Sequence, residues 1–401
     1  MSSDSPAMEK PAGGLMRINM GPSHPSMHGT VRIALDLDGE VVRKAEVEIG
    51  YLHRAFEKTA ENRTWNQVVP YTDRLNYVSP VINNVGYVMA VEKLLGIEVP
   101  ERGQYVRVLM SEVSRITDHL TCNAANAMEV GAMTVFIYLM EAREVFYHLI
   151  EDVTGARLTV SYARVGGVTG DLTPGFLDGL PRAIRRLRVA LDESSRLLMK
   201  NRIFYDRFRG VGVLPRGTAV EHGITGPVGR ASGVDYDVRR DLPYLAYDRL
   251  SFEVPTGTLG DSYDRFRVRM EEMEQSVRLI QQCVRDMPEG PVSADDQRVN
   301  LPPKEDVYRD MEALIRHFKL LMPGHGIRPP AGEAYSAVEG ANGELGFYVV
   351  SDGTDRPWRV RCRPPCFFAV SALDKMIEGG MLADVVPTFG SINMIAGELD
   401  R

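Results

Sequence analysis

The spacing of apolar residues between Arg54 and Met287 constrains the fold of this chain more than any other feature. In three stretches, Val106 to Leu120, Ile184 to Leu198 and Phe266 to Val284, apolar side chains recur every three or four positions. This is the period of an α-helix with one apolar face, and narrow stripes of this kind are typical of helices packed side by side. The sequence therefore predicts a bundle of long antiparallel helices.

Residue types at the ends of these stretches indicate where helices begin and end. Thr173 followed by Pro174 predicts a helix start, because a hydroxyl caps free backbone N–H groups and proline fits the first helical position. Asp261 is expected to cap the helix that follows it. The segment CNAANAME, residues 122–129, is expected to interrupt a helix, which then resumes and continues to about Asp152.

Strand patterns flank the helical region. Apolar residues alternate from Val31 to Leu37, and Asp38-Gly39 follows, which is a strong signal for a β-hairpin. Near the C-terminus, YSAVEGANGELGFYVV predicts a hairpin that turns at Asn342-Gly343, and WRVRCR predicts a further strand. The remaining segment, residues 371–401, is expected to form a short helix and an extended tail.

These patterns predict an α+β protein that is predominantly α. We expect a disordered tail at residues 1–14 and an N-terminal β-region with a histidine-containing loop at residues 15–62. A central helical bundle is expected at residues 63–325. Residues 326–401 would then carry the C-terminal hairpin, the short helix and the extended tail.

Charge and composition exclude several functions. The chain of 401 residues has a formal net charge of −7 and lacks a basic or aromatic motif for nucleic acid. Its longest apolar run, Ala132 to Met140, is too short to cross a bilayer, and its start lacks the pattern of a signal peptide. We therefore expect a soluble protein or one that is peripheral to a membrane.

The cysteines predict neither a disulfide framework nor a metal site. Four cysteines in a chain of this length fit a reducing compartment. Cys362 and Cys366 form a lone C-x3-C pair without a second pair, so we interpret them as ordinary residues at the end of a strand.

Two segments carry residues that could support chemistry. His24 and His28 lie in the loop GPSHPSMHG, where Pro25 disfavours a helix. An imidazole can donate or accept a proton near neutral pH, so this loop is a candidate site. The segment YTDRLNYVSP places Arg74 and Tyr77 on a short stretch that ends in proline, although the residues alone favour a buried tyrosine with a bonded hydroxyl.

Glu129 precedes an apolar run, so its carboxylate is expected to be partly buried and to need a partner, for which a histidine is a natural candidate. The chain contains no G-x-G-x-x-G opening a βαβ unit, no P-loop, no H-E-x-x-H and no nucleophile elbow. The residues alone therefore predict a mostly helical protein with a histidine loop and leave its function open.

Eight segments resemble one known family in sequence and in order. They are GPSHPSMHG, YLHRAFEK, YTDRLNYVSP, GARLTVSYARVGGV, VPTGTLGDSYDRFRVRMEEM, AGEAYSAVE, YVVSDGTDRPWRVRCR and LADVVPTFGSINMIAGELDR. Over residues 15–401 they closely resemble the family of the 49-kDa subunit of respiratory complex I, the proton-pumping NADH-quinone oxidoreductase, and its bacterial counterparts. This family is similar to the large subunit of [NiFe] hydrogenases, so the resemblance implies a hydrogenase-large-subunit-like fold.

Hydrogenases of that kind hold nickel with two C-x-x-C pairs. The resemblance places the first pair at Asn76 and Ser79 and the second at Ile395 and Glu398, so no thiolate remains at any of these positions. Because nickel in these enzymes depends on soft thiolate ligands, we expect metal binding to be lost. In the complex I family, the vacated cavity is the head of the quinone chamber.

The resemblance also implies roles for single residues around that cavity. His28 and Tyr77 are expected to face the quinone headgroup from opposite sides and to donate protons as the quinol forms. Tyr77 is expected to be neutral, since phenols titrate near 10. Glu129 stands where the family commonly has an aspartate that partners the histidine, and His24 is expected to be structural or to line the cavity entrance.

Electrons are expected to arrive from outside this chain. The resemblance implies a neighbouring iron–sulfur subunit that carries the terminal [4Fe-4S] cluster close to the shared interface. Arg54 and Arg74 match arginines that lie near this cluster, where positive charge would stabilise its reduced form. Thr159 stands where several relatives have a titrating histidine, so we predict a cluster potential that is nearly independent of pH.

The family thus implies a quinone-site subunit that binds no cofactor of its own and no metal. Its partners would be the iron–sulfur subunit, other peripheral-arm and membrane-arm subunits of complex I, and quinone, on the cytoplasmic side of the cell membrane. Quinone reduction would drive proton pumping in separate subunits, and the expected contacts suit ubiquinone and menaquinone alike. Three alternatives stay open: a related complex fed by ferredoxin, a non-catalytic scaffold subunit, and a metal hydrogenase, against which the missing cysteine pairs argue.

Overall fold

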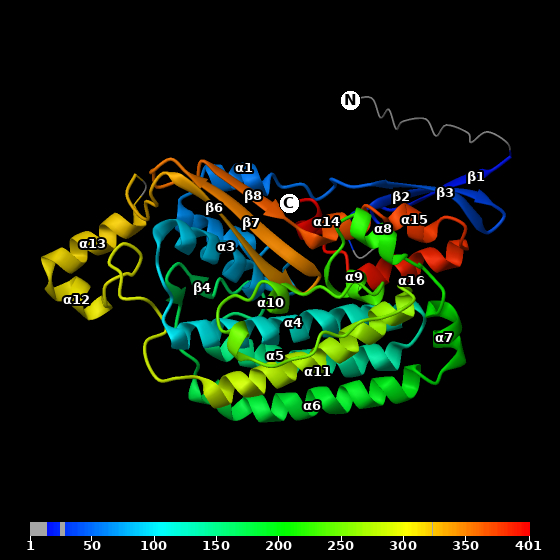
Figure 1. Cartoon of the computed structure of the whole chain (residues 1–401), viewed down its shortest axis with the longest axis horizontal. Coiled ribbons are helices and arrows are strands. Elements are labelled where there is room, and N and C mark those ends of the chain that lie inside the picture. Colours follow the sequence, from blue (N-terminus) through cyan, green and yellow to red (C-terminus); the bar gives the residue numbers. More distant parts are fainter. Residues whose placement is uncertain (1–13, 25–28, 323) are drawn as a thin grey trace.

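The computed structural model describes residues 14–24, 29–322 and 324–401. Helices dominate these residues and the strands form small separate sheets, so the predicted α+β fold with a predominance of α is confirmed. Figure 1 shows long helices stacked along one side of the molecule, one sheet lying over them, and a second sheet at one end. No helix within the described residues has the length and apolar character needed to span a membrane.

Four long helices form a bundle in the lower part of Figure 1. They are α4 (Glu101–Glu129), α5 (Met133–Thr154), α6 (Pro174–Leu198) and α11 (Ser262–Asp286). α4 packs against α5 and α11, and α5 also packs against α6. The predicted bundle of long helices is therefore confirmed.

The predicted starts of two of these helices are also confirmed. The hydroxyl of Thr173 accepts a hydrogen bond from the backbone N–H of Phe176, and Pro174 is the first residue of α6. The carboxylate of Asp261 accepts a hydrogen bond from the backbone N–H of Asp264 at the start of α11. Each cap satisfies one of the N–H groups that lack a partner in the first helical turn.

The predicted interruption at residues 122–129 is wrong, because α4 continues without a break to Glu129. The asparagine residues that suggested a loop are largely buried within the helix. Asn123 donates a hydrogen bond from Nδ2 to the backbone oxygen of Phe266 in α11 at 3.2 Å. Tertiary contacts therefore outweigh the low intrinsic helix propensity of asparagine.

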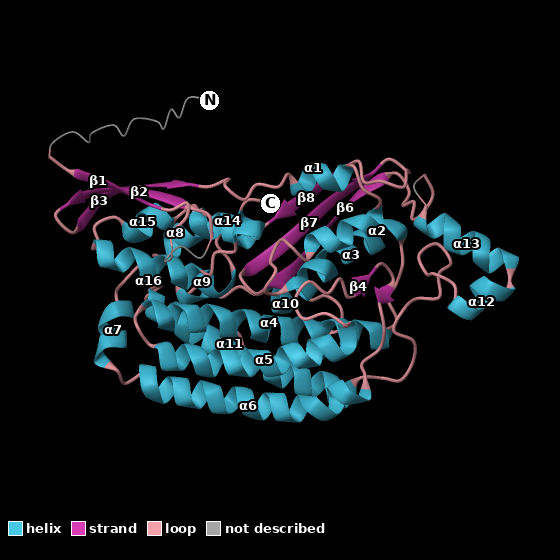
Figure 2. Cartoon of the chain, turned by 180° about the vertical axis from the view of Figure 1, so that it is seen from behind, coloured by secondary structure: helices cyan, strands magenta, loops and turns pink. Residues whose placement is uncertain are grey.

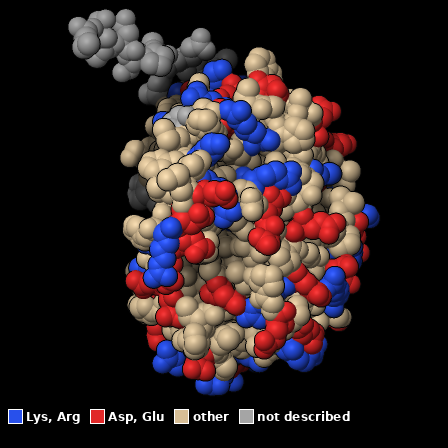
Figure 3. Space-filling view, turned by 90° about the vertical axis from the view of Figure 1, so that its left-hand side faces the viewer, with Lys and Arg blue, Asp and Glu red and all other residues tan. Residues whose placement is uncertain are grey.

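Shorter helices connect and cover these layers. They are α1 (Phe56–Glu61), α2 (Trp65–Thr72), α3 (Pro80–Leu95), α7 (Arg202–Phe208), α8 (Arg216–Glu221), α9 (Gly226–Ala231), α10 (Val238–Asp241), the 3-10 helix η1 (Tyr247–Arg249), α12 (Lys304–Arg309) and α13 (Met311–Leu321). α12 and α13 protrude at one end of the molecule. Figure 3 views that end and shows acidic and basic side chains interspersed, without a large patch of one sign.

The N-terminal sheet consists of three antiparallel strands, β1 (Met16–Met20), β2 (Arg32–Asp38) and β3 (Val41–Glu48). Asp38 pairs with Val41, so the predicted hairpin at Asp38-Gly39 is confirmed. Ile33, Leu35 and Leu37 of β2 are at most 1% exposed, and the intervening Ala34 and Asp36 are also buried.

The C-terminal sheet lies over the bundle and consists of β6 (Gly332–Gly340), β7 (Gly343–Ser351) and β8 (Arg359–Arg363). The predicted hairpin and the predicted third strand are confirmed. The turn lies at Ala341-Asn342 and not at the predicted Asn342-Gly343, because Gly340 pairs with Gly343. Two short strands, β4 (Ala163–Arg164) and β5 (Gly167–Val168), form a separate pair.

The predicted extended tail is wrong, because the C-terminal segment is helical. It contains α14 (Pro365–Val370), α15 (Leu373–Ile377), α16 (Leu382–Ile392) and α17 (Ala396–Leu399). Val385, Phe389 and Ile392 recur at helical spacing and are buried in the smaller apolar cluster, and Gly390 on another side of α16 faces α4. Pro387 within α16 hid this pattern in the sequence. Figure 2 shows α14, α15 and α16 between the N-terminal sheet and the bundle.

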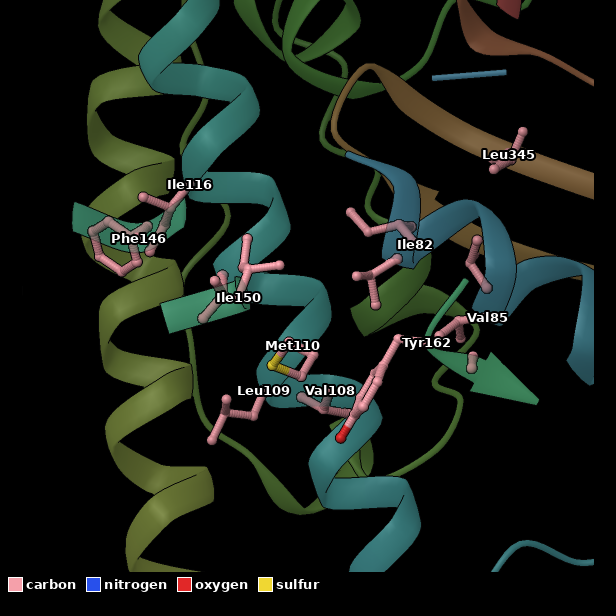
Figure 4. Packing of buried hydrophobic residues seen from close by; sticks show 14 of the residues in the cluster. Ile82, Val85, Val108, Leu109, Met110, Ile116, Phe146, Ile150, Tyr162 and Leu345 are labelled. Atoms are coloured by element: carbon pink, nitrogen blue, oxygen red, sulfur yellow. The ribbon is translucent and has the colours of Figure 1, made fainter. Parts of the chain in front are cut away.

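Two clusters of buried apolar side chains form the core. The larger cluster lies within the bundle and beneath the C-terminal sheet, and Figure 4 shows Ile116 of α4 beside Phe146 and Ile150 of α5. The smaller cluster joins the N-terminal sheet to α14–α17. Leu75 belongs to the larger cluster and Val78 to the smaller, so the loop between α2 and α3 passes from one cluster to the other.

Candidate functional site

The loop between α2 and α3 carries the candidate residue Tyr77, and its neighbour Asn76 fixes its shape. Asn76 Oδ1 accepts hydrogen bonds from the backbone N–H groups of Val78 at 3.1 Å and Ser79 at 3.3 Å. Asn83 in α3 donates from Nδ2 to the backbone oxygen of Asn76 at 3.1 Å. An asparagine that bonds the backbone two residues further on stabilises a tight turn, so Tyr77 lies in an anchored loop.

A set of buried polar side chains lies behind this loop. Asp118 in α4 accepts hydrogen bonds from Asn76 Nδ2 at 3.1 Å and from Asn393 Nδ2 at 2.6 Å, one on each carboxylate oxygen. Asn393 Nδ2 also lies 2.6 Å from Asn342 Oδ1 in the turn between β6 and β7. Asn342 Nδ2 in turn contacts the sulfur of Cys366 at 3.3 Å.

Glu398 in α17 is the last member of this set. Its Oε1 accepts a hydrogen bond from the backbone N–H of Cys366 at 3.0 Å. The thiol of Cys366 also lies 3.6 Å from the backbone oxygen of Asn393. We call these residues the buried polar network: Asn76, Asp118, Asn342, Cys366, Asn393 and Glu398.

Three of the four positions matched to hydrogenase cysteines border this network. Asn76 and Glu398 are members of it, and Ser79 bonds Asn76 through its backbone N–H. The fourth position, Ile395, belongs to the smaller apolar cluster, against which Tyr77 also packs. All four residues are buried, so the structure brings together the positions that the resemblance singled out.

Tyr77 is half-buried and stays protonated at neutral pH. Burial raises the pKa of its phenol above the ordinary value, and the nearby groups of Asp118 and Cys366 raise it further, against an opposing effect of Arg54. A neutral phenol can donate a hydrogen bond or a proton. This agrees with the expectation that Tyr77 is uncharged.

The structure brings Arg54 and Arg74 together. Arg54 Nη2 donates a hydrogen bond to the backbone oxygen of Arg74 at 2.6 Å, and both side chains are exposed. A Cβ atom added to Gly397 of α17 would lie 2.5 Å from that same oxygen and 2.8 Å from Arg54 Nη2. Two exposed guanidinium groups therefore lie close to the helix that carries Glu398. Beside Arg74 the surface has a hollow of about 480 Å³, lined by Arg63, Gln67, Pro70, Tyr71 and Arg74.

His28 lies outside the described residues, so its place opposite Tyr77 stays a prediction. The residue that follows it, Gly29, lies against the C-terminal segment. A Cβ atom on Gly29 would lie 2.8 Å from Met394 Cε and 2.9 Å from Ala396 Cβ. One end of the histidine loop is therefore next to α17. His24 is described and is half-buried.

Glu129 is half-buried at the end of α4, where its carboxylate faces α16. A Cβ atom on Gly390 of α16 would overlap Glu129 Oε2. The predicted pairing of Glu129 with His28 stays a prediction, because His28 lies outside the described residues. The carboxylate of α4 that belongs to the buried polar network is Asp118, which bonds Asn393.

Thr159 is half-buried in the segment between α5 and β4. This segment contacts the end of α2, because the backbone N–H of Ser161 donates to Asp73 Oδ1 at 3.2 Å. Asp73 directly precedes Arg74, so the segment of Thr159 lies near the exposed arginines.

Cys362 and Cys366, the C-x3-C pair of the sequence, are both free cysteines and form no joint metal site in the described residues. Cys362 lies in β8 and Cys366 in the first turn of α14, and both are buried. Burial raises the pKa of both thiols well above the ordinary value, so both stay protonated. Cys366 contacts Asn342 and Asn393. Across the described ranges, no group of three or more His, Cys, Asp or Glu residues is arranged to hold a metal ion.

Three members of the buried polar network, Asp118, Asn342 and Asn393, were not predicted as site residues from the sequence. Asp118 lies between Ile116 and Leu120 in an apolar stripe, and a carboxylate at that place in a buried helix is a signal that could have been used. Asn342 was interpreted only as a turn residue. Asn393 follows α16 with a positive φ of 60°, which asparagine tolerates better than most residues, but no pattern in the sequence showed its partner.

A second buried network of charged residues was also missed. Glu112 Oε2 accepts from Arg115 Nε at 3.2 Å, and Glu112 Oε1 accepts from Arg239 Nη1 at 3.1 Å. His119, which follows Asp118, lies with Nε2 2.8 Å from Glu272 Oε2. These contacts join α4 to α10 and α11.

Comparison with known proteins shows which family the chain resembles. Residues 129–401 match the family described as respiratory-chain NADH dehydrogenase, 49 Kd subunit. The chain is 56% identical over 387 residues to a D-type subunit of the NADH-quinone oxidoreductase of Sorangium cellulosum, covering 96% of this chain and 95% of the relative. It is 51% identical to the D-type subunit of Myxococcus xanthus, covering 96% and 92%, and 48% identical to that of Geobacter sulfurreducens, covering 96% and 99%.

The fold and these similarities define the class of protein as a subunit of an oxidoreductase complex. The chain belongs to the 49-kDa subunit family of respiratory-chain NADH dehydrogenase, complex I, whose bacterial relatives are named as the D-type subunits of NADH-quinone oxidoreductase.

Proposed function

We propose that this chain forms the quinone-reduction site of a proton-translocating NADH-quinone oxidoreductase, and that Tyr77 and His28 contact the quinone headgroup. The names of the relatives supply quinone as the class of substrate. The observation that carries the proposal is the position of Tyr77. Its protonated phenol lies next to the buried polar network, and no cysteine stands at the four positions matched to nickel ligands.

The chemistry of quinone reduction suits these groups. Two electrons and two protons convert the two carbonyl oxygens of a quinone into hydroxyl groups, and the basicity of these oxygens rises as electrons arrive. The phenol of Tyr77 donates a hydrogen bond to one oxygen and can pass its proton to it, and His28 serves the other oxygen. Glu129 is proposed to be the carboxylate partner of His28.

The surface next to Tyr77 and the buried polar network suits the electron donor. The exposed Arg54 and Arg74 lie against α17, so a neighbouring iron–sulfur subunit that docks there would bring its [4Fe-4S] cluster close to this network. Positive charge near the cluster stabilises the reduced form by Coulomb attraction. We assign this interface, and the contacts to other complex I subunits, to the cytoplasmic side of the cell membrane.

The relatives favour NADH over ferredoxin as the source of electrons. All three compared relatives are named NADH-quinone oxidoreductase subunits, and each aligns over nearly the full length of this chain. Purification of the complex with flavin-containing and NADH-binding subunits would support this assignment, and their absence would favour the ferredoxin-fed alternative.

Replacement of Tyr77 by phenylalanine tests the proposal. Tyr77→Phe removes only the hydroxyl, so NADH-driven quinone reduction is expected to fall by about 10²-fold, as for loss of a general acid. Reduction of an artificial acceptor that takes electrons upstream of the quinone site should be unchanged. Tyr308→Phe is the matched control, because Tyr308 lies on α12 and is 84% exposed.

His28→Ala is a second test, with His148→Ala as its control, because His148 lies on the surface of α5. Quinone reduction should fall while electron transfer to the upstream acceptor persists. Full quinone activity in both Tyr77→Phe and His28→Ala would show that the site lies elsewhere.

A further inference from the structure

The buried polar network contains two carboxyl groups without a neutralising cation. Asp118 is fully buried and Glu398 is 2% exposed. Within residues 14–24, 29–322 and 324–401, neither carboxyl forms an ion pair with a lysine, arginine or histidine. Two carboxylates without a cation in one buried network are costly, because each loses its hydration and each repels the other.

The hydrogen bonds distinguish the two carboxyls. Each oxygen of Asp118 accepts an amide N–H, from Asn76 and from Asn393, so its charged form is well satisfied. The strongest hydrogen bond to Glu398 comes from the backbone N–H of Cys366 at 3.0 Å, and those from the Cys366 thiol and the Asn342 amide are weaker. When two like groups share a buried site, the less well bonded group keeps the proton. Geometry therefore assigns the charge to Asp118 and the proton to Glu398.

The electrostatic environment agrees with this assignment. Burial raises the pKa of Glu398 to about 7, and the charge of Asp118 adds to the increase, while hydrogen bonds from Cys366 and Asn342 oppose it. The titratable or charged groups that act on this network from the surrounding elements are Asp118 and His119 of α4, Tyr77 of the loop before α3, Arg54 before α1, Cys362 of β8, Cys366 of α14 and the C-terminal Arg401.

We propose that Glu398 is a proton store for the quinone chamber: it holds a proton in the resting protein and releases it when the bound quinone is reduced. This inference rests on the proposed quinone site and deepens it. Glu398 lies in the helix that contacts Arg54 and Arg74 through Gly397, and it belongs to the same buried polar network as Asn76, the neighbour of Tyr77.

The protons balance as follows when two electrons reach the quinone. The hydroxyl of Tyr77 gives its proton to one quinone oxygen, and the other oxygen takes its proton from solvent. The O–H bond of Glu398 then breaks and the hydroxyl of Tyr77 is restored, which leaves Glu398 as a carboxylate. Solvent returns one proton to Glu398 before the next turnover. Glu398 acts through Tyr77 and is therefore a positioning residue and not a group that touches the quinone.

Redox-difference infrared spectroscopy of the intact complex tests this proposal. A protonated buried carboxyl has a C=O stretch that an ionised carboxylate lacks. We expect a carboxylic acid band in the oxidised complex that shifts in D₂O, decreases on reduction by NADH, and is absent from Glu398→Gln. Glu378→Gln is the matched control, because Glu378 is exposed and accepts one backbone N–H, from Ala45 at 3.0 Å. The control should retain the band.

Two further variants separate a proton store from a structural role. Glu398→Asp keeps the carboxyl and should restore the band. Asp118→Asn removes the neighbouring charge, so the band should disappear at a lower pH than in the unchanged protein, and this measurement serves if Glu398→Gln prevents assembly. In addition, quinone reductase activity should lose its inflection near pH 7 in Glu398→Gln but keep it in Glu378→Gln.

A wild-type complex without an acid band, or a band that persists in Glu398→Gln, would overturn the protonation of Glu398. A band that is present but does not change on reduction would overturn its role as a store. Both results are independent of the Tyr77→Phe test, which decides where the quinone binds.

Discussion

Asn393, the residue that ends α16, donates a hydrogen bond from Nδ2 to Oδ1 of Asp118 in α4 at a distance of 2.6 Å. This contact ties the C-terminal segment to the helical bundle within the buried polar network. α17, which contains Glu398, follows shortly after Asn393 in the chain, so this contact also fixes where α17 begins. The candidate site therefore depends on one bond between two residues that are far apart in the sequence.

Replacement of Asn393 by glycine should destabilise the protein by about 1.5–3 kcal/mol, because Asp118 loses a donor to a buried charge. Glycine keeps the positive φ of 60° at this position, so the loss reports the side chain and not backbone strain. Denaturant unfolding of the purified chain measures the change. A loss below about 0.5 kcal/mol would show that the bond to Asp118 contributes little.

Replacement of Gly397 by alanine should separate α17 from the exposed arginines. The new Cβ would lie 2.5 Å from the backbone oxygen of Arg74, so the backbone must shift, at a cost of about 1–3 kcal/mol. Gly217→Ala in α8 is the control, because a Cβ there meets no atom within 4 Å. Equal stabilities of the two variants in denaturant unfolding would contradict the close approach of α17 and Arg74.

The buried ion pair of Glu92 and Arg107 should be essential for folding. Arg107 Nη1 lies 2.9 Å from Glu92 Oε2, and the arginine is fully buried. Glu92→Gln leaves an uncompensated buried charge and should cost about 3–5 kcal/mol. Asp192→Asn, in an exposed pair with Arg196, should cost less than about 1 kcal/mol. Thermal unfolding compares the stabilities of the two variants. Similar losses of stability in both would contradict the burial of the Glu92–Arg107 pair.

The second buried network should make stability depend on acid pH. Burial alone would raise the pKa of Glu112, but the guanidinium groups of Arg115 and Arg239 outweigh this effect, and the pKa falls to about 2. In the unfolded chain the pKa of a glutamate is about 4.3, so Glu112 releases its proton more readily in the folded protein. This difference in pKa contributes about 3 kcal/mol to the free energy of unfolding. The contribution is fully present above about pH 4.3 and is lost as the pH falls towards 2.

Denaturant unfolding at a series of pH values between neutral and acid checks this dependence. Glu112→Gln should be less stable than the unchanged protein at neutral pH and should lose less stability on acidification. Parallel curves for the two proteins would contradict the assignment of Glu112 to an ionised state.

The potential of the neighbouring cluster should be nearly independent of pH if Thr159 replaces a titrating histidine near it. Threonine has no ionisable group in this range. A redox titration of the intact complex at several pH values measures the slope. A slope close to roughly 59 mV per pH unit, the size for one proton per electron, would refute the prediction. In Thr159→His, the cluster potential should become dependent on pH, with a slope below that full value.

Local patterns in the sequence predicted much of the fold. The hairpin after Asp38 and the start of α6 at Thr173 were correct because both depend on residues adjacent in sequence. The predicted break before Glu129 and the extended tail were wrong. In both regions the chain is helical although its sequence contains asparagine, glycine or proline. Buried contacts with distant elements stabilise these helices.

The candidate site could be predicted only in part. The resemblance selected Asn76 and Glu398 as neighbours of Tyr77, and the structure brings Asn76 and Glu398 into one network. Asp118 and Asn393 escaped prediction, because their partners lie on other elements and their bonds exist only in the folded chain. A polar residue in an apolar stripe indicates a buried partner but does not identify it.

The most direct test of the central claim, that quinone binds against Tyr77, is photoaffinity labelling of the purified complex with a photoreactive quinone, followed by mass spectrometry of the labelled peptides. We predict that the label attaches to the peptide that contains Tyr77 or to residues 393–398, and that excess quinone prevents it. Labelling confined to other subunits, or to distant surface elements such as α12 and α13, would contradict the claim.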